Sequence, residues 1–328
     1  MGGVAIFMAV LVGVGMAAAT GGVGAQSMLR QPGLYGGIFG GVTLLLAVGL
    51  ADDFFDLSPA IKLLAQGMAA MFAISGGLTL PLAQFGPHAT ITLGWMGIPL
   101  TLFWIIAVTN AFNFIDGLDG LAASIGVVGF GTTLVSAAIL GHSDVVMLSA
   151  VLIGGLLGFL RYNIAPARIY LGDCGSLLIG YLLATLSLVG ATSSAGAVIV
   201  YVPLFALSLP LLDGIVAIAR RWLRHMRVWK GDHRHIHHRV QALGLTKRQT
   251  VAVLSGAAVV WGLAGLLTSF APPAWFPVMI PLTLIVTAGL AVLGLRRLDY
   301  YEFRAVRIAW RRRPDSWRRF VREEIRMH

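Results

Sequence analysis

Long apolar segments recur from one end of the chain to the other, separated by short polar stretches. Each segment has close to the roughly 20 residues that an α-helix needs to cross the hydrocarbon core of a bilayer. The pattern predicts an all-α, polytopic membrane protein with about ten transmembrane helices over 2–20, 36–51, 61–80, 98–115, 120–140, 145–160, 175–192, 196–219, 250–270 and 274–295. We expect a single integral membrane domain over 1–295 and a basic tail over 296–328.

Basic residues are divided unequally between the two sides of these spans. Ten spans place both termini on one side, and that side receives 23 of the 24 Lys and Arg residues, leaving only Arg30 on the other. Because positive charge concentrates in cytoplasmic loops, we expect both termini and the even-numbered loops in the cytoplasm. The segment 81–97, on the far side, has the alternation typical of a short β-hairpin.

Composition supports the membrane assignment. The chain is 57% hydrophobic and 12% charged, with a mean hydropathy of +0.84, which leaves too little charge for the surface of a soluble domain. The net charge of +10 does not indicate nucleic-acid binding, because the basic residues flank spans, where they set topology and contact the lipid bilayer. The single Cys174 excludes an internal disulfide, and the first segment lacks the basic start of a signal peptide.

Except for Asp144, which falls on the far side, the aspartates before the tail are predicted to gather on the cytoplasmic side. Eight of them lie at or near cytoplasmic ends of spans: Asp52, Asp53, Asp56, Asp116, Asp119, Asp173, Asp213 and Asp232. Ionisable groups at membrane depth are costly and usually functional, so the set predicts a cytoplasmic active site rather than separate helix caps. A transporter is a weaker hypothesis, because a carrier needs charges near the midplane and the centres of most spans have none.

Two stretches suit phosphate chemistry. In "ADDFFDLSPAIKLLAQ" (51–66), the adjacent Asp52 and Asp53 precede Lys62, a set that suits a divalent cation and a phosphate. In "GDCGS", Asp173 lies between glycines at the start of a span, where a helix N-terminus favours anions; it could hold a metal or cap the helix.

Two further stretches suit a nucleotide sugar. In "TNAFNFIDGLDGL" (109–121), offsets of three predict one helical face, suited to a metal, a nucleobase or a sugar, that carries Asn110, Asn113, Asp116 and Asp119. In "GDHRHIHHRV" (231–240), histidines are mixed with arginines and no cysteine is present, which favours a polyanion over zinc. Together the four stretches indicate Mg²⁺, a nucleotide diphosphate and a lipid substrate.

Four motifs, taken in order, resemble those of the polyprenyl-phosphate N-acetylhexosamine-1-phosphate transferases of glycosyltransferase family 4. They are "DD" (52–53), "NAFNFIDGLDGLAA" (110–123), "ARIYLGDCGS" (167–176) and "HIHHR" (235–239). The resemblance implies a multi-pass enzyme of the bacterial inner membrane that uses Mg²⁺, with Mn²⁺ as a substitute. It implies transfer of N-acetylhexosamine 1-phosphate, such as GlcNAc 1-phosphate, from a UDP-sugar to undecaprenyl phosphate, with release of UMP, as the first membrane step of envelope polysaccharide synthesis. The alternative is the sister branch, the phospho-MurNAc-pentapeptide transferases of peptidoglycan synthesis, which carries a different histidine motif.

The resemblance also implies roles for individual residues. Asp173 and Asp52 would hold Mg²⁺, Asp52 or Asp53 would prepare the lipid phosphate for attack, and Lys62 would contact phosphate. The nucleotide would be bound by Asn110, Asn113, Asp116 and Asp119. The sugar and pyrophosphate would face His235, His237, His238 and Arg239.

One departure concerns the start of the chain. Members of the family usually have a first span and a basic loop before a stretch like "MGGVAIF", which here begins the sequence. A late start codon, a shortened product or a natural short form would each account for this, and an inactive membrane scaffold is a hypothesis only in the last case. The sequence does not specify the donor sugar, the downstream polymer or whether the protein forms a homodimer.

Overall fold

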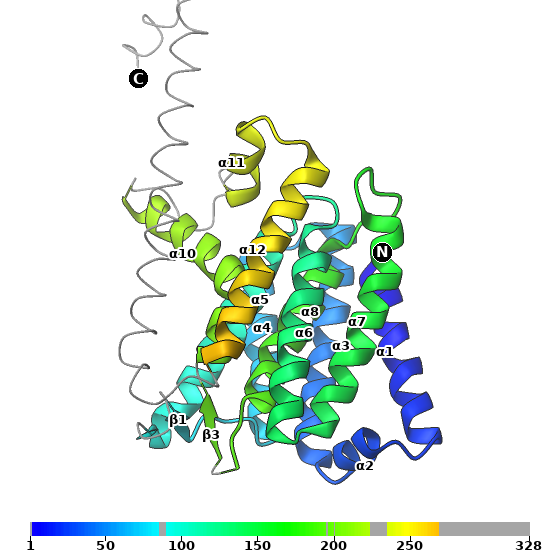
Figure 1. Ribbon diagram of the computed structural model, residues 1–328, viewed down its shortest axis with the longest axis vertical. Helices are drawn as coiled ribbons and strands as arrows, with labels where there is room; N and C mark the ends of the chain where they lie inside the picture. Colours follow the sequence, from blue (N-terminus) through cyan, green and yellow to red (C-terminus); the bar gives the residue numbers. More distant parts are fainter. Residues whose placement is uncertain (1, 85–89, 195, 200, 224–234, 269–328) are drawn as a thin grey trace, which may run out of the picture.

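The computed structural model describes residues 2–84, 90–194, 196–199, 201–223 and 235–268 (Figure 1). The predicted span at 274–295, the basic tail and Asp232 lie outside these residues.

Long helices run up and down side by side and form one bundle (Figure 1). Seven helices of the described residues are long and apolar enough to cross a membrane, and α4 is a shorter apolar helix. The all-α membrane fold is thereby confirmed, whereas the count of ten spans is not. The α-helices are α1 (Gly2–Ala19), α2 (Val23–Leu29), α3 (Pro32–Phe55), α4 (Pro59–Ser75), α5 (Gly97–Ile115), α6 (Leu121–Leu140), α7 (Ser143–Asn163), α8 (Gly172–Gly190), α9 (Tyr201–Ala206), α10 (Ser208–Leu223), α11 (Ile236–Ala242) and α12 (Lys247–Thr268).

The span predicted over 196–219 is wrong as a single helix. The structure divides this stretch into strand β3 (Ala197–Ile199), the short helix α9 and helix α10. Pro203 and Pro210 each lie in the first turn of a helix, where a missing N–H is tolerated, whereas in the interior of one long helix each would break it. Proline spacing therefore explains the division.

A small sheet lies at the end of the bundle opposite α11 (Figure 1). Strand β1 (Leu82–Gln84) pairs antiparallel with β2 (Thr90–Thr92), with Leu82 opposite Thr92, and this confirms the predicted hairpin. A one-turn 3₁₀ helix, η1 (Gly94–Met96), follows β2. Strand β3 joins the other edge of β1 in parallel, which the sequence did not predict.

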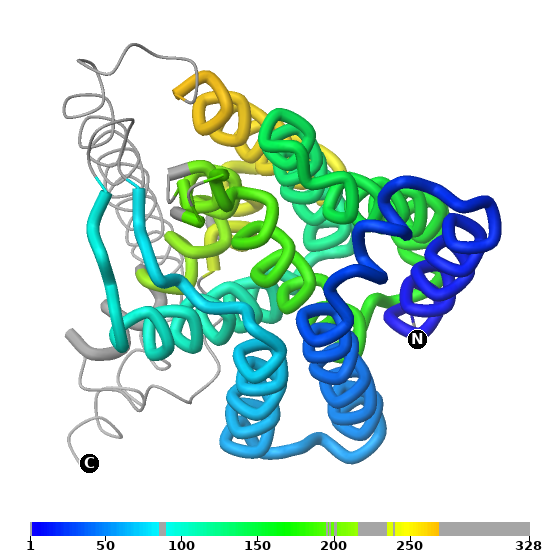
Figure 2. The backbone as a smooth tube through the Cα atoms, turned by 90° about the horizontal axis from the view of Figure 1, so that it is seen from below, coloured from blue at the N-terminus to red at the C-terminus, as the bar shows by residue number. Residues whose placement is uncertain are grey.

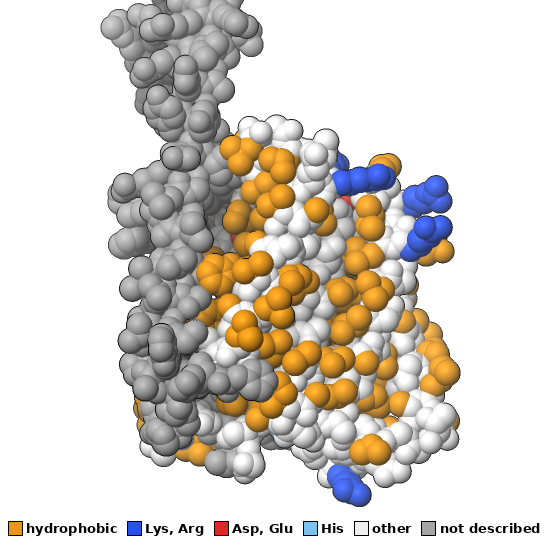
Figure 3. All heavy atoms as spheres, viewed as in Figure 1, with side chains coloured by type: hydrophobic (Ala, Val, Ile, Leu, Met, Phe, Trp, Pro, Cys, Tyr) orange, Lys and Arg blue, Asp and Glu red, His pale blue; other side chains and the backbone are white. Residues whose placement is uncertain are grey.

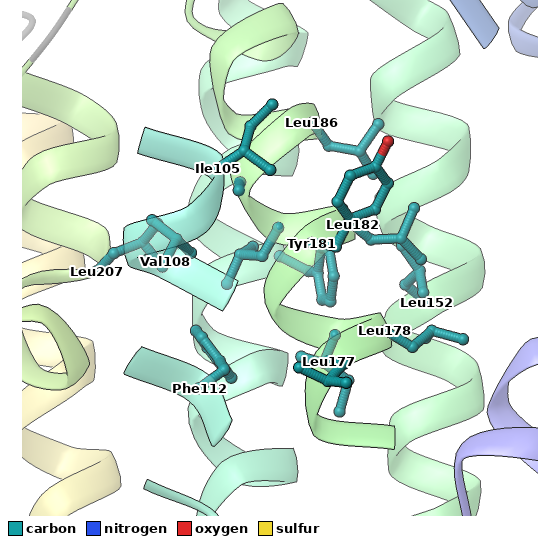
Figure 4. Packing of buried hydrophobic residues seen from close by; sticks show 14 of the residues in the cluster. Ile105, Val108, Phe112, Leu152, Leu177, Leu178, Tyr181, Leu182, Leu186 and Leu207 are labelled. Carbon is teal, nitrogen blue, oxygen red and sulfur yellow. The ribbon is translucent and has the colours of Figure 1, made fainter. Parts of the chain in front are cut away.

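Helix α8 is the centre of the bundle. It contacts α1, α3, α5, α6 and α7, and every residue from Cys174 to Gly190 is buried. Figure 2 shows the bundle end-on, and Figure 4 shows Leu177, Tyr181 and Phe112 packed in this core. The Tyr181 hydroxyl donates a hydrogen bond of 3.0 Å to the carbonyl of Ala69 on α4, which satisfies its only buried polar atom. The central helix therefore fixes the position of its own first turn, where Asp173 lies.

Glycine at position 49 allows α3 and α8 to approach closely just below the aspartates. A Cβ added to Gly49 would lie 2.4 Å from the Cα of Cys174, whereas one added to Gly36 on the same helix meets nothing within 4 Å. We expect Gly49→Ala to lower the free energy of unfolding by about 1–3 kcal/mol through overpacking. Gly36→Ala should leave it unchanged or raise it by up to about 1 kcal/mol. Denaturant unfolding in detergent measures both, and equal stabilities would contradict the contact.

Candidate active site

Lys62 joins two aspartates from separate helices. Its Nζ atom lies 3.0 Å from Asp52 Oδ2 and 2.9 Å from Asp173 Oδ2. Asp52 is in the last turn of α3, Lys62 in the first turn of α4 and Asp173 in the first turn of α8. All three side chains are mostly buried, so their attraction is less screened than on an open surface. The structure therefore brings together three residues that the sequence predicted as one phosphate site.

The turn between α3 and α4 holds this arrangement. Asp56 ends α3 with a left-handed backbone (φ 50°), and Ser58 caps the start of α4. The backbone N–H of Leu57 donates a 2.8 Å hydrogen bond to Asp52 Oδ1. Both carboxylate oxygens of Asp52 therefore have partners, one in the turn and one in Lys62.

Asp53 forms its hydrogen bond with a different helix from the one that Lys62, the partner of Asp52, belongs to. The backbone N–H of Asp173 donates a 2.9 Å hydrogen bond to Asp53 Oδ1. Gly172, which precedes it, has φ +72°, and a Cβ there would lie 2.5 Å from Asp53 Oδ2. The two adjacent carboxylates thus have different main partners, the Lys62 side chain for Asp52 and the Asp173 backbone for Asp53.

Of the two predicted asparagines, only Asn113 reaches Asp173. Its side chain hydrogen-bonds to the Asp173 carboxylate and donates to Ser176 Oγ at 3.0 Å. Asn110 lies one turn deeper, where it exchanges side-chain amide hydrogen bonds with the buried Gln66. Gln66 and Ser176 were not among the predicted site residues, although each lies about one helical turn after one that was, Lys62 or Asp173.

The single helical face predicted for 110–119 ends early. Helix α5 ends at Ile115, because Asp116 leaves the helical region (ψ 34°) and Gly120 has φ +83°. Beyond this point Asp119 contacts other segments of the chain. Its Oδ2 accepts a hydrogen bond from the N–H of Ala167 at 3.4 Å and lies 3.7 Å from Nζ of Lys247, the first residue of α12. The predicted face is therefore wrong for the two aspartates, which belong to the loop after α5.

Asp116 lies among negative charges. Burial raises its pKa well above the usual range, and the charges of Asp173, Asp53 and Asp119 raise it further. Lys62 contacts Asp173 of this group, and Lys247 lies 3.7 Å from Asp119. A further cation beside Asp116 would lower its pKa and stabilise the carboxylate form.

These acids have the chemistry of a magnesium site without forming a closed one. Within the described ranges, no group of three His, Cys, Asp or Glu side chains is close enough to hold an ion without other ligands. Mg²⁺ usually takes one or two carboxylates and completes its shell with water and substrate phosphate oxygens. The hard oxygen donors of Asp173 and Asp116, with their excess of negative charge, fit that ion.

Asp213 anchors the histidine motif. His235 directly precedes α11 as its N-cap, and its Nδ1 lies 2.9 Å from Asp213 Oδ2. The N–H of Ile236 donates to Asp213 Oδ1 at 2.8 Å. The His235 ring also stacks on Phe114, with centroids 5.8 Å apart. Asp213 was predicted to lie with the other aspartates but was given no role, and the structure makes it the partner of His235.

His237 is buried against the loop that carries Asp116. It is 1% exposed, and a Cβ at Gly117 would lie 2.5 Å from its Nε2. Its ring nitrogens have no hydrogen-bond partner among the described residues, and the His238 ring centroid lies 4.1 Å away. The histidine motif therefore adjoins the aspartate loop, as predicted; the side chain of Arg239 lies outside the description.

The buried His237 predicts a pH-dependent stability. Burial, with a smaller effect of His238, lowers its pKa from 6.5 to about 4. Below pH 6.5, residue 237 is therefore protonated in the unfolded chain, whereas in the folded protein it stays neutral down to about pH 4. The free energy of unfolding consequently falls as the pH drops through this window.

We expect His237→Phe, which cannot titrate, to lose less stability than wild type between pH 7 and pH 4.5, a range that covers most of the window. Thermal unfolding in detergent at both pH values tests this. Because all other titrating groups are common to both proteins, parallel pH curves would contradict the prediction.

Comparison with known proteins places these residues in a family context. The model of glycosyl transferase family 4 matches residues 35–191. A Bacillus subtilis (strain 168) protein named "Probable undecaprenyl-phosphate N-acetylglucosaminyl 1-phosphate transferase" is 37% identical over 288 residues, 87% of this chain and 77% of its own length. The "Decaprenyl-phosphate N-acetylglucosaminephosphotransferase" of Mycobacterium tuberculosis (strain CDC 1551 / Oshkosh) is 33% identical over 329 residues, 92% of this chain and 80% of its own. The "Undecaprenyl-phosphate alpha-N-acetylglucosaminyl 1-phosphate transferase" of Yersinia pestis is 30% identical over 231 residues, 68% of this chain and 63% of its own.

Proposed function

The chain belongs to glycosyl transferase family 4, and we propose that it transfers N-acetylglucosamine 1-phosphate from UDP-GlcNAc to undecaprenyl phosphate, releasing UMP. The observation that carries the proposal is the contact of Lys62 with Asp52 and Asp173, beside Asp116, at one end of an apolar bundle. This end can receive a phosphorylated lipid from the membrane and a nucleotide sugar from water. Among the described side chains, Arg161, Arg168 and Arg248 lie at this end and Arg30 lies at the opposite one, which supports a cytoplasmic active site in the inner membrane.

The proposed reaction exchanges one phosphorus–oxygen bond for another. An oxygen of the lipid phosphate attacks the β-phosphorus of UDP-GlcNAc, and the bond from that phosphorus to the bridging oxygen breaks. UMP leaves with the bridging oxygen, and the product is a lipid pyrophosphate that carries the sugar. Such transfers depend on positioning and on stabilising the charge of the phosphoryl group. Lys62 supplies a positive charge for this purpose where α3, α4 and α8 meet.

The contacts of the two adjacent aspartates favour positioning over proton removal. Asp52 accepts hydrogen bonds from Leu57 and Lys62, and Asp53 accepts one from the backbone of Asp173. A phosphate monoester has a second pKa near about 6, so at neutral pH the attacking group already carries most of its charge. We infer that Asp52 orients Lys62 and that Asp53 orients the first turn of α8.

Magnesium would be held by Asp173 and Asp116, with Asp52 close by. When bound, the ion neutralises charge on the pyrophosphate during transfer. Asn113 orients Asp173 through their hydrogen bond, and His237 keeps the loop of Asp116 in place through Gly117. The uridine would bind along that loop, near Asp119.

A donor panel tests the proposal directly. Membrane-reconstituted protein is supplied with undecaprenyl phosphate, Mg²⁺ and either UDP-GlcNAc, another UDP-N-acetylhexosamine or UDP-MurNAc-pentapeptide, and UMP release is measured. We expect release with UDP-GlcNAc that stops when Mg²⁺ is chelated and resumes with Mn²⁺. Release with UDP-MurNAc-pentapeptide alone would favour the peptidoglycan branch, and no release from folded protein with any donor would refute the transferase.

A further inference from the structure

A pocket lined by three arginines lies on the outer side of the loop after α7. Its volume is about 760 Å³, and its lining consists of Arg161, Tyr162, Ile164, Pro166, Arg168 and Arg248. This volume lies within the range of roughly 300–1,000 Å³ that is usual for small-molecule sites. None of its lining residues belongs to the Lys62–Asp173 site.

The pocket carries uncompensated positive charge. Within the described part of the chain, none of its three arginines forms an ion pair with an acid. The nearby Asp119 is 3.7 Å from Lys247 instead. Arg248 donates its Nε–H to the carbonyl of Ala165 at 2.6 Å, which uses one of its five donors. The other N–H donors of Arg248 and those of Arg161 and Arg168 suit a phosphate, because two of its oxygens can accept the paired N–H groups of a planar guanidinium.

The surroundings of the pocket are those of a membrane boundary. Arg161 is in the last turn of the apolar helix α7, and Arg248 is in the first turn of the apolar helix α12. Tyr162 and Ile164 are each about half exposed, at 50% and 51%. Figure 3 shows basic side chains gathered at this end of the molecule, above a wall of hydrophobic ones. Arginine, tyrosine and aliphatic side chains together match the level of lipid headgroups.

From these observations we propose that the pocket of Arg161, Arg168 and Arg248 binds the phosphate headgroup of an anionic phospholipid from the adjoining leaflet. The tyrosine and isoleucine contact the start of the acyl chains. A soluble anion would not use these apolar walls, so the lipid is the occupant that fits both halves of the lining. The proposal does not depend on the transferase reaction.

The segment 161–168, which lines the pocket, is hydrogen-bonded to the loop 116–120 of the candidate active site. The N–H of Gly120 donates to Asn163 Oδ1 at 2.9 Å, and the N–H of Ala167 donates to Asp119 Oδ2 at 3.4 Å. A lipid phosphate bound to Arg161, Arg168 and Arg248 would reduce the mobility of the segment 161–168. Through these hydrogen bonds it would also reduce the mobility of the loop 116–120. Lipid composition would thereby influence a loop of the candidate active site.

Lipid binding can be measured without any enzyme assay. Native mass spectrometry of the full chain in detergent compares phosphatidylglycerol with phosphatidylcholine of the same chain length. Wild type and the control Arg30→Gln, at the opposite end of the bundle, should bind phosphatidylglycerol equally. Arg161→Gln/Arg168→Gln should bind it about 30-fold more weakly, from about 1 kcal/mol for each arginine. The basic tail is unchanged in all three proteins, so only the difference between them is interpreted.

Two further measurements separate lipid binding from its alternatives. The double variant retains Arg248 and its bond to Ala165, and equal thermal unfolding in phosphatidylcholine shows that it is folded. Hydrogen exchange should slow at 161–168 and 116–120 when phosphatidylglycerol is added to wild type, and should not slow in the double variant. Equal lipid binding by wild type and the double variant, or complete displacement of the lipid by inorganic phosphate, would overturn the proposal.

Discussion

Asp173→Asn is expected to reduce UMP release by about 10³-fold, because loss of a metal-stabilised charge costs several kcal/mol in the transition state. Asparagine keeps the size of the side chain and an oxygen that can still accept from Lys62, so the fold should remain. The concentration of Mg²⁺ that gives half the maximal rate should rise as well. Both quantities come from a UMP-release assay titrated with Mg²⁺.

Asp56→Asn is the matched control for this change. It removes the same charge from an exposed position one helical turn beyond Asp52, and asparagine tolerates the left-handed backbone of residue 56. We expect its rate to stay within about threefold of wild type, as for surface substitutions away from a site. If Asp173→Asn behaved like Asp56→Asn while remaining folded, the metal assignment would have to be abandoned.

Motifs made of neighbouring residues could be predicted from the sequence. The stretches that carry Asp52, Lys62 and Asp173 were each selected from consecutive residues, and the bundle brings the three side chains to one end. The hairpin at 81–97 was recognised from its alternation for the same reason. In each case the signal lies in consecutive residues, although the contact that completes the site joins Lys62 to Asp173 over 111 residues.

Features that depend on contacts between distant segments could not be predicted. The departure of Asp116 and Asp119 from the predicted helical face belongs to a loop that bonds to Asn163 and Ala167, more than 40 residues away. The pairing of Asp213 with His235 joins α10 to α11 across 22 residues. Hydropathy also combined β3, α9 and α10 into one span, because it measures apolar character and not backbone direction. Tertiary contacts decide the first two, whereas the third follows from Pro203 and Pro210, which hydropathy does not register.

Gly172→Ala tests whether the approach of Asp53 to the start of α8 matters for catalysis. The added methyl group would lie 2.5 Å from Asp53 Oδ2 and 2.8 Å from Oδ1, so the carboxylate must move and release the N–H of Asp173. A displacement of about 1 Å at a reacting group can cost about 10²-fold in rate. We therefore expect UMP release to fall by about that factor.

Gly141→Ala is the control that introduces backbone strain without displacing Asp53. Gly141 also has a positive φ, +83° against +72° at Gly172, but a Cβ there meets nothing within 4 Å. Both substitutions should lower the free energy of unfolding by about 1–2 kcal/mol, the cost of left-handed backbone for an L-residue. Only Gly172→Ala should lose activity. Equal activities in the two folded variants would mean that Asp53 does not position Asp173, whereas a loss confined to Gly172→Ala follows from their hydrogen bond.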